Sequence, residues 1–307
     1  MALALNEDEM EKYLAAGEIA RKVKKESRKW VREGVSLLDL CEKIESRIVE
    51  LGGSPAFPCN ICVDEIAAHF TPPPGFTGSI PQEGLVKIDF GVHVDGYIVD
   101  TAFTIPLSPR DREMVEVAEE CLLKVSGILK AGIKISQIGE IVEKFANSKG
   151  FKVIRNLTGH QVDRFNLHTG FSIPNVRIFS TEKFRKDMVV AIEPFITIAD
   201  GSGEVGESEE AYIYRFKYLS MNYTGEFGSL VKKIHNSFKT LPFCERWIMS
   251  QFREVGRDFL KKVLENYRKN LMLYPVLIEK NRKKVAQAED TFLVLEDSAI
   301  NLTSGEV

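Results

Sequence analysis

Alternating and helical patterns of hydrophobic residues divide the chain into strands and helices. Residues 85 to 105 are rich in β-branched and aromatic residues on both sides of Asp95-Gly96, a dipeptide typical of two-residue hairpin turns. Apolar residues recur at helical spacing in residues 37 to 51 and 114 to 129, and glycines suited to helix ends follow both segments. Residues 7 to 32 have the pattern of a charged amphipathic helix. The chain is therefore predicted to form one-faced helices that cover a sheet.

Two aspartates of the predicted hairpin, Asp89 and Asp100, fall on the same face. If Asp95-Gly96 is the loop, Gly91 lies opposite Asp100, and Asp89 is a diagonal neighbour of Asp100. Two carboxylates held so close repel each other, and a shared proton or shared cations would relieve the repulsion. The pattern leaves two interpretations open: a buried cation site, or two solvent-facing aspartates on an edge hairpin.

Three further metal-type side chains lie in or beside apolar segments. His160 lies in an alternating stretch, Glu193 precedes a proline within a long apolar run, and Glu289 lies just before the apolar residues 292 to 295. Taken singly, an acid is more often a structural or surface residue, and a lone histidine is more often a satisfied core residue. Taken together, four carboxylates and one imidazole suit two divalent ions such as Mn, Fe, Co or Zn.

Six blocks of the chain resemble, in the same order, the methionine aminopeptidases of the M24 pita-bread metallopeptidases, specifically the short, archaeal-like form of type II. The blocks are PAFPCNICVDEIAAHFTP (55 to 72), KIDFGVHVDGYIVDTA (87 to 102), NLTGHQVDRFNLHTGFSIPN (156 to 175), VVAIEPF (189 to 195), LPFCERW (241 to 247) and YPVL (274 to 277). The resemblance implies an α+β pita-bread fold with a curved antiparallel sheet and outer helices. It also implies a catalytic domain over residues 1–205 and 275–307, and a helical, winged-helix-like insertion subdomain over residues 206–274.

The same resemblance implies an activity and a set of site residues. The activity is co-translational removal of the initiator methionine, by hydrolysis of the first peptide bond with two divalent ions (Co, Mn, Fe or Zn). The implied metal ligands are Asp89, Asp100, His160, Glu193 and Glu289, with Asp100 and Glu289 bridging both ions. The implied catalytic residues are His69, His168 and Glu193, with Glu193 also the proton shuttle. The implied substrate-binding residues are Phe57, His69, Leu167, His168 and Tyr274, although core packing explains Phe57 and Leu167 equally well.

Three positions depart from the family pattern without removing an implied ligand. Asp290 stands where a histidine commonly follows the bridging glutamate, Phe165 where tyrosine is frequent, and Thr169 where alanine is common. We expect an extra acid beside the ions to change ion preference or the pH optimum. We expect the missing phenol of Phe165 to loosen a hydrogen bond near the ligands.

Composition defines the class of protein and its expected surroundings. The 307 residues are 44% hydrophobic and 28% charged, which is typical of a globular chain. The formal net charge of −3 gives no global basic field, and no clear nucleic-acid site is predicted. The sequence contains no apolar run of about 20 residues, so no membrane span is predicted. Five cysteines, an odd number, suit the reduced thiols of a cytoplasmic protein. Expected partners are nascent polypeptides with an N-terminal Met and a small second residue; a monomer is expected, and ribosome association stays open.

Two other functions remain as alternatives. A proline-specific aminopeptidase of the same fold would keep five ligands, but such enzymes usually have a distinct run of histidines and a larger N-terminal domain. A non-catalytic binding scaffold would have lost metal ligands, whereas this sequence retains all five together with His69 and His168.

Overall fold

Two ten-residue strands, β4 (Leu85–Val94) and β5 (Tyr97–Pro106), form the predicted hairpin. The computed structural model describes residues 5–218, 223, 225 and 227–304. Val94 pairs with Tyr97 across the turn and Gly91 pairs with Asp100, which is the predicted register. Asp95 and Gly96 have φ angles of 51° and 91°, as a tight turn between twisted strands requires. Short strands extend this sheet beside β4: β1 (Ser54–Pro55) and β2 (Asn60–Val63).

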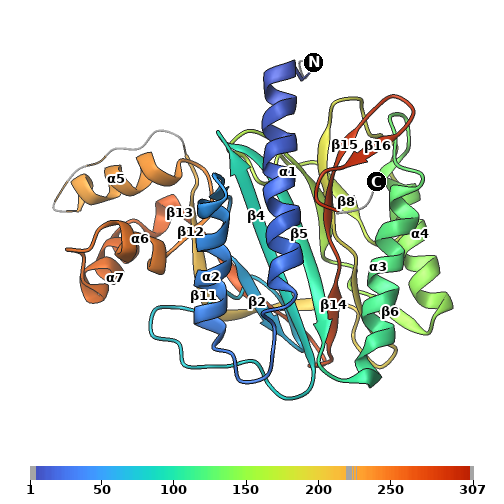
Figure 1. Ribbon diagram of the computed structural model, residues 1–307, viewed down its shortest axis with the longest axis horizontal. Coiled ribbons are helices and arrows are strands. Elements are labelled where there is room, and N and C mark those ends of the chain that lie inside the picture. Colours follow the sequence, from blue (N-terminus) through green and yellow to red (C-terminus); the bar gives the residue numbers. More distant parts are fainter. Residues whose placement is uncertain (1–4, 219–222, 224, 226, 305–307) are drawn as a thin grey trace.

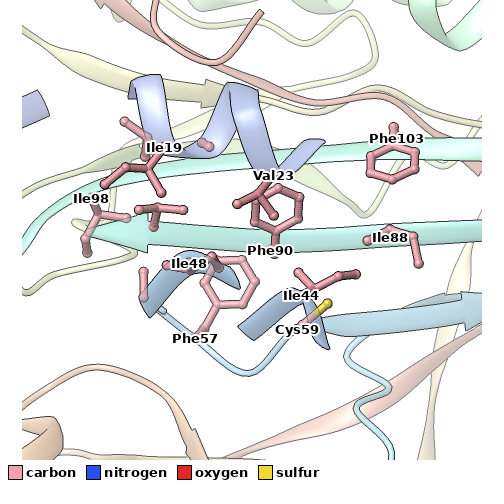
Figure 2. Close-up of a cluster of buried hydrophobic side chains, with 14 of the residues drawn as sticks. Ile19, Val23, Ile44, Ile48, Phe57, Cys59, Ile88, Phe90, Ile98 and Phe103 are labelled. Atoms are coloured by element: carbon pink, nitrogen blue, oxygen red, sulfur yellow. The ribbon is translucent and has the colours of Figure 1, made fainter. Parts of the chain in front are cut away.

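Helices α1 (Glu7–Ser27) and α2 (Leu37–Glu50) cover one face of this sheet (Figure 1), with α1 on the hairpin and α2 on β1 and β2. A capping box between Asn6 and Glu9 starts α1, and the helix ends at Ser27, short of the predicted Arg32. Neither α1 nor any other helix in the described ranges combines the length and apolar character needed to cross a membrane. Figure 2 shows how side chains of both helices meet the hairpin in one buried cluster, which includes Ile19, Val23, Ile44, Ile48, Phe90 and Ile98.

A second hydrophobic core lies under α3 (Arg112–Ser126), which begins after the short helix η1 (Pro109–Asp111), and α4 (Ile135–Ser148). The helix predicted at residues 114 to 129 is confirmed as α3, although it begins and ends slightly earlier. These helices pack on two antiparallel sheets. One sheet contains β14 (Val285–Gln287), β10 (Phe195–Ile198) and β6 (Phe151–Val153). The other contains β16 (Ala299–Asn301), β15 (Asp290–Val294), β9 (Val189–Ile192), β7 (Thr158–Val162) and β8 (Ser172–Pro174).

The segment predicted to be a helical insertion begins and ends in strands. The fourth sheet has the order β12 (Phe243–Cys244), β11 (Val205–Phe216), β13 (Leu271–Glu279) and β3 (Ile66–Ala68). Between its long strands lie α5 (Gly228–Phe238), α6 (Glu245–Gln251), α7 (Arg257–Asn266) and η2 (Arg268–Asn270). The three α-helices gather at one end of the molecule, opposite α3 and α4 (Figure 1), and they have their own hydrophobic core. The division into two domains stays a prediction.

The close approach of α1 to the C-terminal segment gives a stability prediction. A Cβ atom on Gly17 would lie 2.3 Å from the main-chain oxygen of Leu302, well inside van der Waals contact. We expect Gly17→Ala to lower the free energy of unfolding by about 1–3 kcal/mol, the usual effect of overpacking. Urea unfolding measures this change. Gly127→Ala is the control, because its nearest neighbouring atom would be 3.7 Å away; equal losses in the two variants would refute the clash.

Candidate metal centre

Every site residue implied by the sequence resemblance lines a single cavity of about 250 Å³. Its wall is formed by side chains from the β4–β5 hairpin, from β7 and from the segments that carry Glu193 and Glu289. The implied ligands on the wall are Asp89, Asp100, His160, Glu193 and Glu289. The implied substrate-binding residues on the wall are Phe57, His69, Leu167, His168 and Tyr274. Residues separated by more than 200 positions in the sequence therefore converge on one site.

The hairpin aspartates face this cavity. Asp89 on β4 pairs with Ala102, and Asp100 on β5 pairs with Gly91, so the two acids are diagonal neighbours on one face, as predicted. Asp100 is only 4% exposed, and Asp89 is half-buried. The interpretation of the pair as solvent-facing residues is therefore wrong.

Glu193 lies at a break between two strands. The long apolar run predicted as one strand is β9 followed by β10, with Glu193 and Pro194 between them. Proline lacks the amide hydrogen that a continuous ladder would need. Asn175 Nδ2 donates to the main-chain oxygen of Glu193 at 2.8 Å, which satisfies that carbonyl at the break.

Glu289 lies where the hairpin meets the second half of the molecule. Its amide donates to the oxygen of Ala102 at 3.1 Å, and the amide of Ala102 donates to the oxygen of Glu289 at 3.2 Å. This isolated bridge brings the Glu289 side chain next to the ligands on β5 and β7. One potential ligand atom from each of Asp100, His160 and Glu289 lies within 4.8 Å of the others. His160 Nε2 lies 3.5 Å from both Asp100 Oδ2 and Glu193 Oε1.

Two amides that the sequence analysis missed hold the carboxylates. Asn60 Nδ2 donates to Asp89 Oδ2 at 3.3 Å, and Gln287 Nε2 donates to Glu289 Oε2 at 3.2 Å. Both residues are buried. Gln287 could have been found from the sequence, because it lies two residues before Glu289 in a strand-like pattern and residues at this spacing share a face. Asn60 carries no such signal, because its contact crosses from β2 to β4.

The electrostatics of the cavity favour cations. One carboxylate oxygen on each of Asp89, Asp100 and Glu289 is buried without a hydrogen-bond partner among the described residues. Burial raises the pKa of all four carboxyl groups, and the charge of Asp100 raises the pKa values of Asp89, Glu193 and Glu289 further. Four acids and an imidazole around these unpaired oxygens have the donor chemistry of a divalent-cation site. The residues therefore fit the metal ions that the sequence resemblance implies.

Two histidines on the cavity wall are neutral at neutral pH. His69 has a φ of 66°, and its Nδ1 lies 3.1 Å from the oxygen of Pro275. Burial lowers the pKa of His69 to about 4. The His168 ring is 4.3 Å from the His160 ring. One side of His168 is open to solvent, and burial of the other side against the protein lowers the pKa of His168. Nearby His160 and His69 lower this pKa further. Each neutral imidazole can donate one hydrogen bond and accept another.

The apolar part of the wall joins core and cavity. Phe57 is 6% exposed, belongs to the core cluster of Figure 2 and also lines the cavity. Its core packing is therefore confirmed, and its role in substrate binding stays a prediction. Leu167 behaves in the same way. Ile213 and Pro242 complete the wall from the segment between residues 206 and 274. Nothing in the local sequence distinguished these two apolar residues from ordinary core residues.

The three departures from the family pattern lie off the cavity wall formed by the described residues. The Asp290 carboxylate faces Lys24 and not the cavity, so the expected position of this acid beside the ions was wrong, while its expected effect on ion preference stays a prediction. Phe165 packs on the hairpin turn, where a Cβ atom on Gly96 would lie 2.3 Å from its ring, so a phenol there would not reach the ligands. The Thr169 amide donates to the oxygen of Gln161 at 3.2 Å, which any residue except proline could do.

Comparisons with known proteins show the family of this chain. The family model for metallopeptidase family M24 matches residues 11–225. The methionine aminopeptidase of Pyrococcus abyssi is 41% identical over 298 residues, covering 96% of this chain and 99% of the relative. That of Methanothermobacter thermautotrophicus is 38% identical over 297 residues, covering 96% and 98%. These relatives give no support to the proline-specific or non-catalytic alternatives.

Solved structures show the same fold. The methionine aminopeptidase of Thermotoga maritima has a TM-score of 0.71 at 22% identity, covering 99% of this chain and all of that one. A thermophilic Arx1 has a TM-score of 0.81 at 20% identity, covering 99% of this chain and 92% of that one. At such identities these likenesses concern the fold alone, and they confirm the predicted pita-bread architecture. With the sequence matches, they show that the chain belongs to metallopeptidase family M24, among the methionine aminopeptidases, and is a metal-dependent aminopeptidase.

Proposed function

We propose that this chain removes the initiator methionine from nascent proteins by hydrolysing their first peptide bond. The observation that carries the proposal is the convergence of four buried or half-buried carboxylates and His160 on a cavity with apolar walls. The unpaired carboxylate oxygens call for cations, and the apolar walls suit an uncharged side chain.

Five side chains would hold two divalent ions in this proposal. Asp100 and Glu289 would hold both ions, Asp89 would hold one of them, and His160 and Glu193 would hold the other. The 3.5 Å separations of His160 Nε2 from Asp100 and Glu193 support this grouping. When bound, the ions lower the pKa of a water molecule and polarise the scissile carbonyl. Mn, Fe, Co and Zn all suit this donor set.

Glu193 carries the proton in the proposed reaction. Burial and the charges of Asp100 and Asp89 raise the pKa of its carboxyl group, which favours uptake of a proton by this group. The proton comes from the attacking water and goes to the amine that leaves as the peptide bond breaks. Neutral His168 lies on the wall, where it can donate a hydrogen bond to the substrate carbonyl. The Nδ1 proton of neutral His69 is used by the oxygen of Pro275, so its Nε2 is left as a hydrogen-bond acceptor for a peptide N–H or a water molecule.

The methionine side chain would occupy the apolar part of the cavity. Phe57, Leu167 and Tyr274 form the walls of this pocket, with Ile213 beside them. An unbranched thioether fills such a narrow, uneven space well. Substrates with a small second residue, a monomeric enzyme and a cytoplasmic location complete the proposal. The location is supported by five cysteines that are all free thiols.

Peptides that differ at the first two positions test this function. We expect Mn²⁺- or Co²⁺-loaded protein to release free methionine from Met-Ala-Ser and not from its N-acetylated form. An Xaa-Pro peptide should stay intact. Cleavage of Xaa-Pro alone would favour a proline-specific enzyme, and no turnover with any ion would favour a binding scaffold.

A further inference from the structure

The ammonium group of Lys24 is largely buried between β5, which carries Asp100, and the segment of Glu289. The Lys24 side chain of α1 is 14% exposed and that of Asp290 is 8% exposed, with Nζ 2.9 Å from Oδ1. Lys24 Nζ also donates to the main-chain oxygen of Glu289 at 3.2 Å and to Thr101 Oγ1 at 2.8 Å. One ammonium group thus contacts the residue after Asp100, the residue after Glu289 and the backbone of Glu289 itself.

Asp290 extends this contact to the C-terminal segment. Thr303 Oγ1 donates to Asp290 Oδ1 at 2.8 Å, and Asn301 Nδ2 donates to Asp290 Oδ2 at 3.1 Å. The amide of Thr291 donates to Thr303 Oγ1 at 2.9 Å. Side chains from α1 and from the C-terminal segment therefore both contact the residues that follow Glu289.

No continuous ladder joins β5, which carries Asp100, to the segment of Glu289 just before β15. Ala102 and Glu289 form an isolated bridge. Further along, side chains make the connection: Thr291 Oγ1 lies 2.7 Å from both the amide and the oxygen of Asp100, and Thr101 Oγ1 donates to the oxygen of Glu289 at 2.9 Å. We call these contacts between residues 100–102 and residues 289–291 the seam. The separation of the Asp100 and Glu289 carboxylates depends on the side-chain contacts at the seam, and Lys24 and Asp290 are a charged pair that contacts it.

We propose that Lys24 and Asp290 are positioning residues that set the relative placement of the Asp100 and Glu289 carboxylates, and thereby the affinity for metal ions. This inference rests on the proposed function, in which these two acids would hold both ions. Stability alone does not require a buried ion pair, since apolar residues of similar volume are often equally stabilising. The direct contacts of Lys24 with the Glu289 backbone and with Thr101 give the pair its more specific role.

Metal binding by stripped protein tests the inference without relying on turnover. The variants are Lys24→Met, Asp290→Asn and the double variant, in which no buried charge is left without its partner. Lys284→Met is the matched control, since Lys284 Nζ lies 2.8 Å from a carboxylate oxygen of Asp111 in a partly buried pair that does not contact the seam. Mn²⁺ affinity is measured by titration calorimetry, and the Co²⁺ absorption spectrum reports the arrangement of ligands.

We expect the Kd for Mn²⁺ to rise about 10- to 100-fold in both single variants, as is usual when groups that orient metal ligands are lost. The Co²⁺ spectrum should change as well. In the double variant thermal stability should recover relative to the single variants while Mn²⁺ binding stays weak, and Lys284→Met should bind Mn²⁺ like wild type.

Folded variants with the wild-type Kd and Co²⁺ spectrum would overturn the inference, even if their melting temperatures fell. Recovery of Mn²⁺ affinity together with stability in the double variant would also overturn it, because the pair would then serve the fold alone. Wild-type protein that binds neither ion would overturn the proposed function and this inference together. Wild-type binding with unaffected variants overturns the inference alone.

Discussion

Glu193→Gln is expected to lower kcat for methionine release by about 10²- to 10⁴-fold, the range typical for loss of a general acid–base group. The amide cannot take a proton from water or pass one to the leaving amine, and it is a weaker cation ligand than a carboxylate. Its similar shape preserves the Asn175 contact, which uses the main-chain oxygen of Glu193. The measurement is kcat on Met-Ala-Ser at saturating Mn²⁺, with the bound ion quantified in both proteins.

Glu204→Gln is the control for this loss. The Glu204 carboxylate pairs with Arg155 and Lys280 at the surface and is absent from the cavity wall formed by the described residues. We expect its kcat to equal that of wild type. A Glu193→Gln enzyme with wild-type kcat would remove Glu193 from the proposed proton transfer.

Metal removal is expected to abolish activity and to change how stability depends on pH. In stripped protein the pKa values of Asp89, Asp100, Glu193 and Glu289 lie above their ordinary range. A raised pKa in the folded state means that the folded protein binds more protons than the unfolded chain. The contribution of these groups to stability is therefore full below the ordinary carboxyl pKa of about 4, and it is lost as the pH rises through the raised values.

Thermal unfolding in chelator and in Mn²⁺, at intervals from about pH 5 to about pH 8, measures this effect. Stripped protein should lose stability as the pH rises across this range, because the four carboxyl groups of the site lose their protons. Mn²⁺ at about 1,000 times its Kd should add about 4 kcal/mol near the upper end, where the carboxylates are free of protons. The double variant Asp100→Asn, Glu289→Gln has fewer acids to titrate, and its stripped form should show a shallower pH dependence. A stripped wild type that gains stability as the pH rises would contradict the assigned electrostatics, unless the double variant gained equally from groups elsewhere.

Local signals sufficed for the hairpin, whereas the set of site residues came from the family resemblance and stays a prediction. Asp95-Gly96 set the turn, and the turn set which face of β4 and β5 carried Asp89 and Asp100. The sequence could not show that this face is buried, because the partners that bury it come from distant segments. Glu193 was recognised as an interruption of an apolar run, but the division of that run into β9 and β10 depends on their separate sheets.

Contacts between distant segments escaped prediction for the same reason. Lys24 and Asp290 are 266 positions apart, and no helical or strand pattern links them. Asp290 was expected beside the ions because it follows Glu289, whereas its carboxylate contacts Lys24 and Thr303 and does not line the cavity. Most of β11 and the start of β13 were taken as part of a helical segment. The exposed acids Glu207, Glu209 and Glu210 hide the strand pattern of β11, and its ladder with β13 forms only when both strands are present.

Stepwise reconstitution tests the central claim that the cavity is a metal-dependent methionyl aminopeptidase site. Chelator-stripped protein is titrated with Mn²⁺ or Co²⁺ while bound ion per chain and free methionine released from Met-Ala-Ser are recorded together. Our account predicts no release without ions and a rate that rises with bound ion to a plateau. Release of methionine by ion-free protein at the rate of the loaded protein would contradict it.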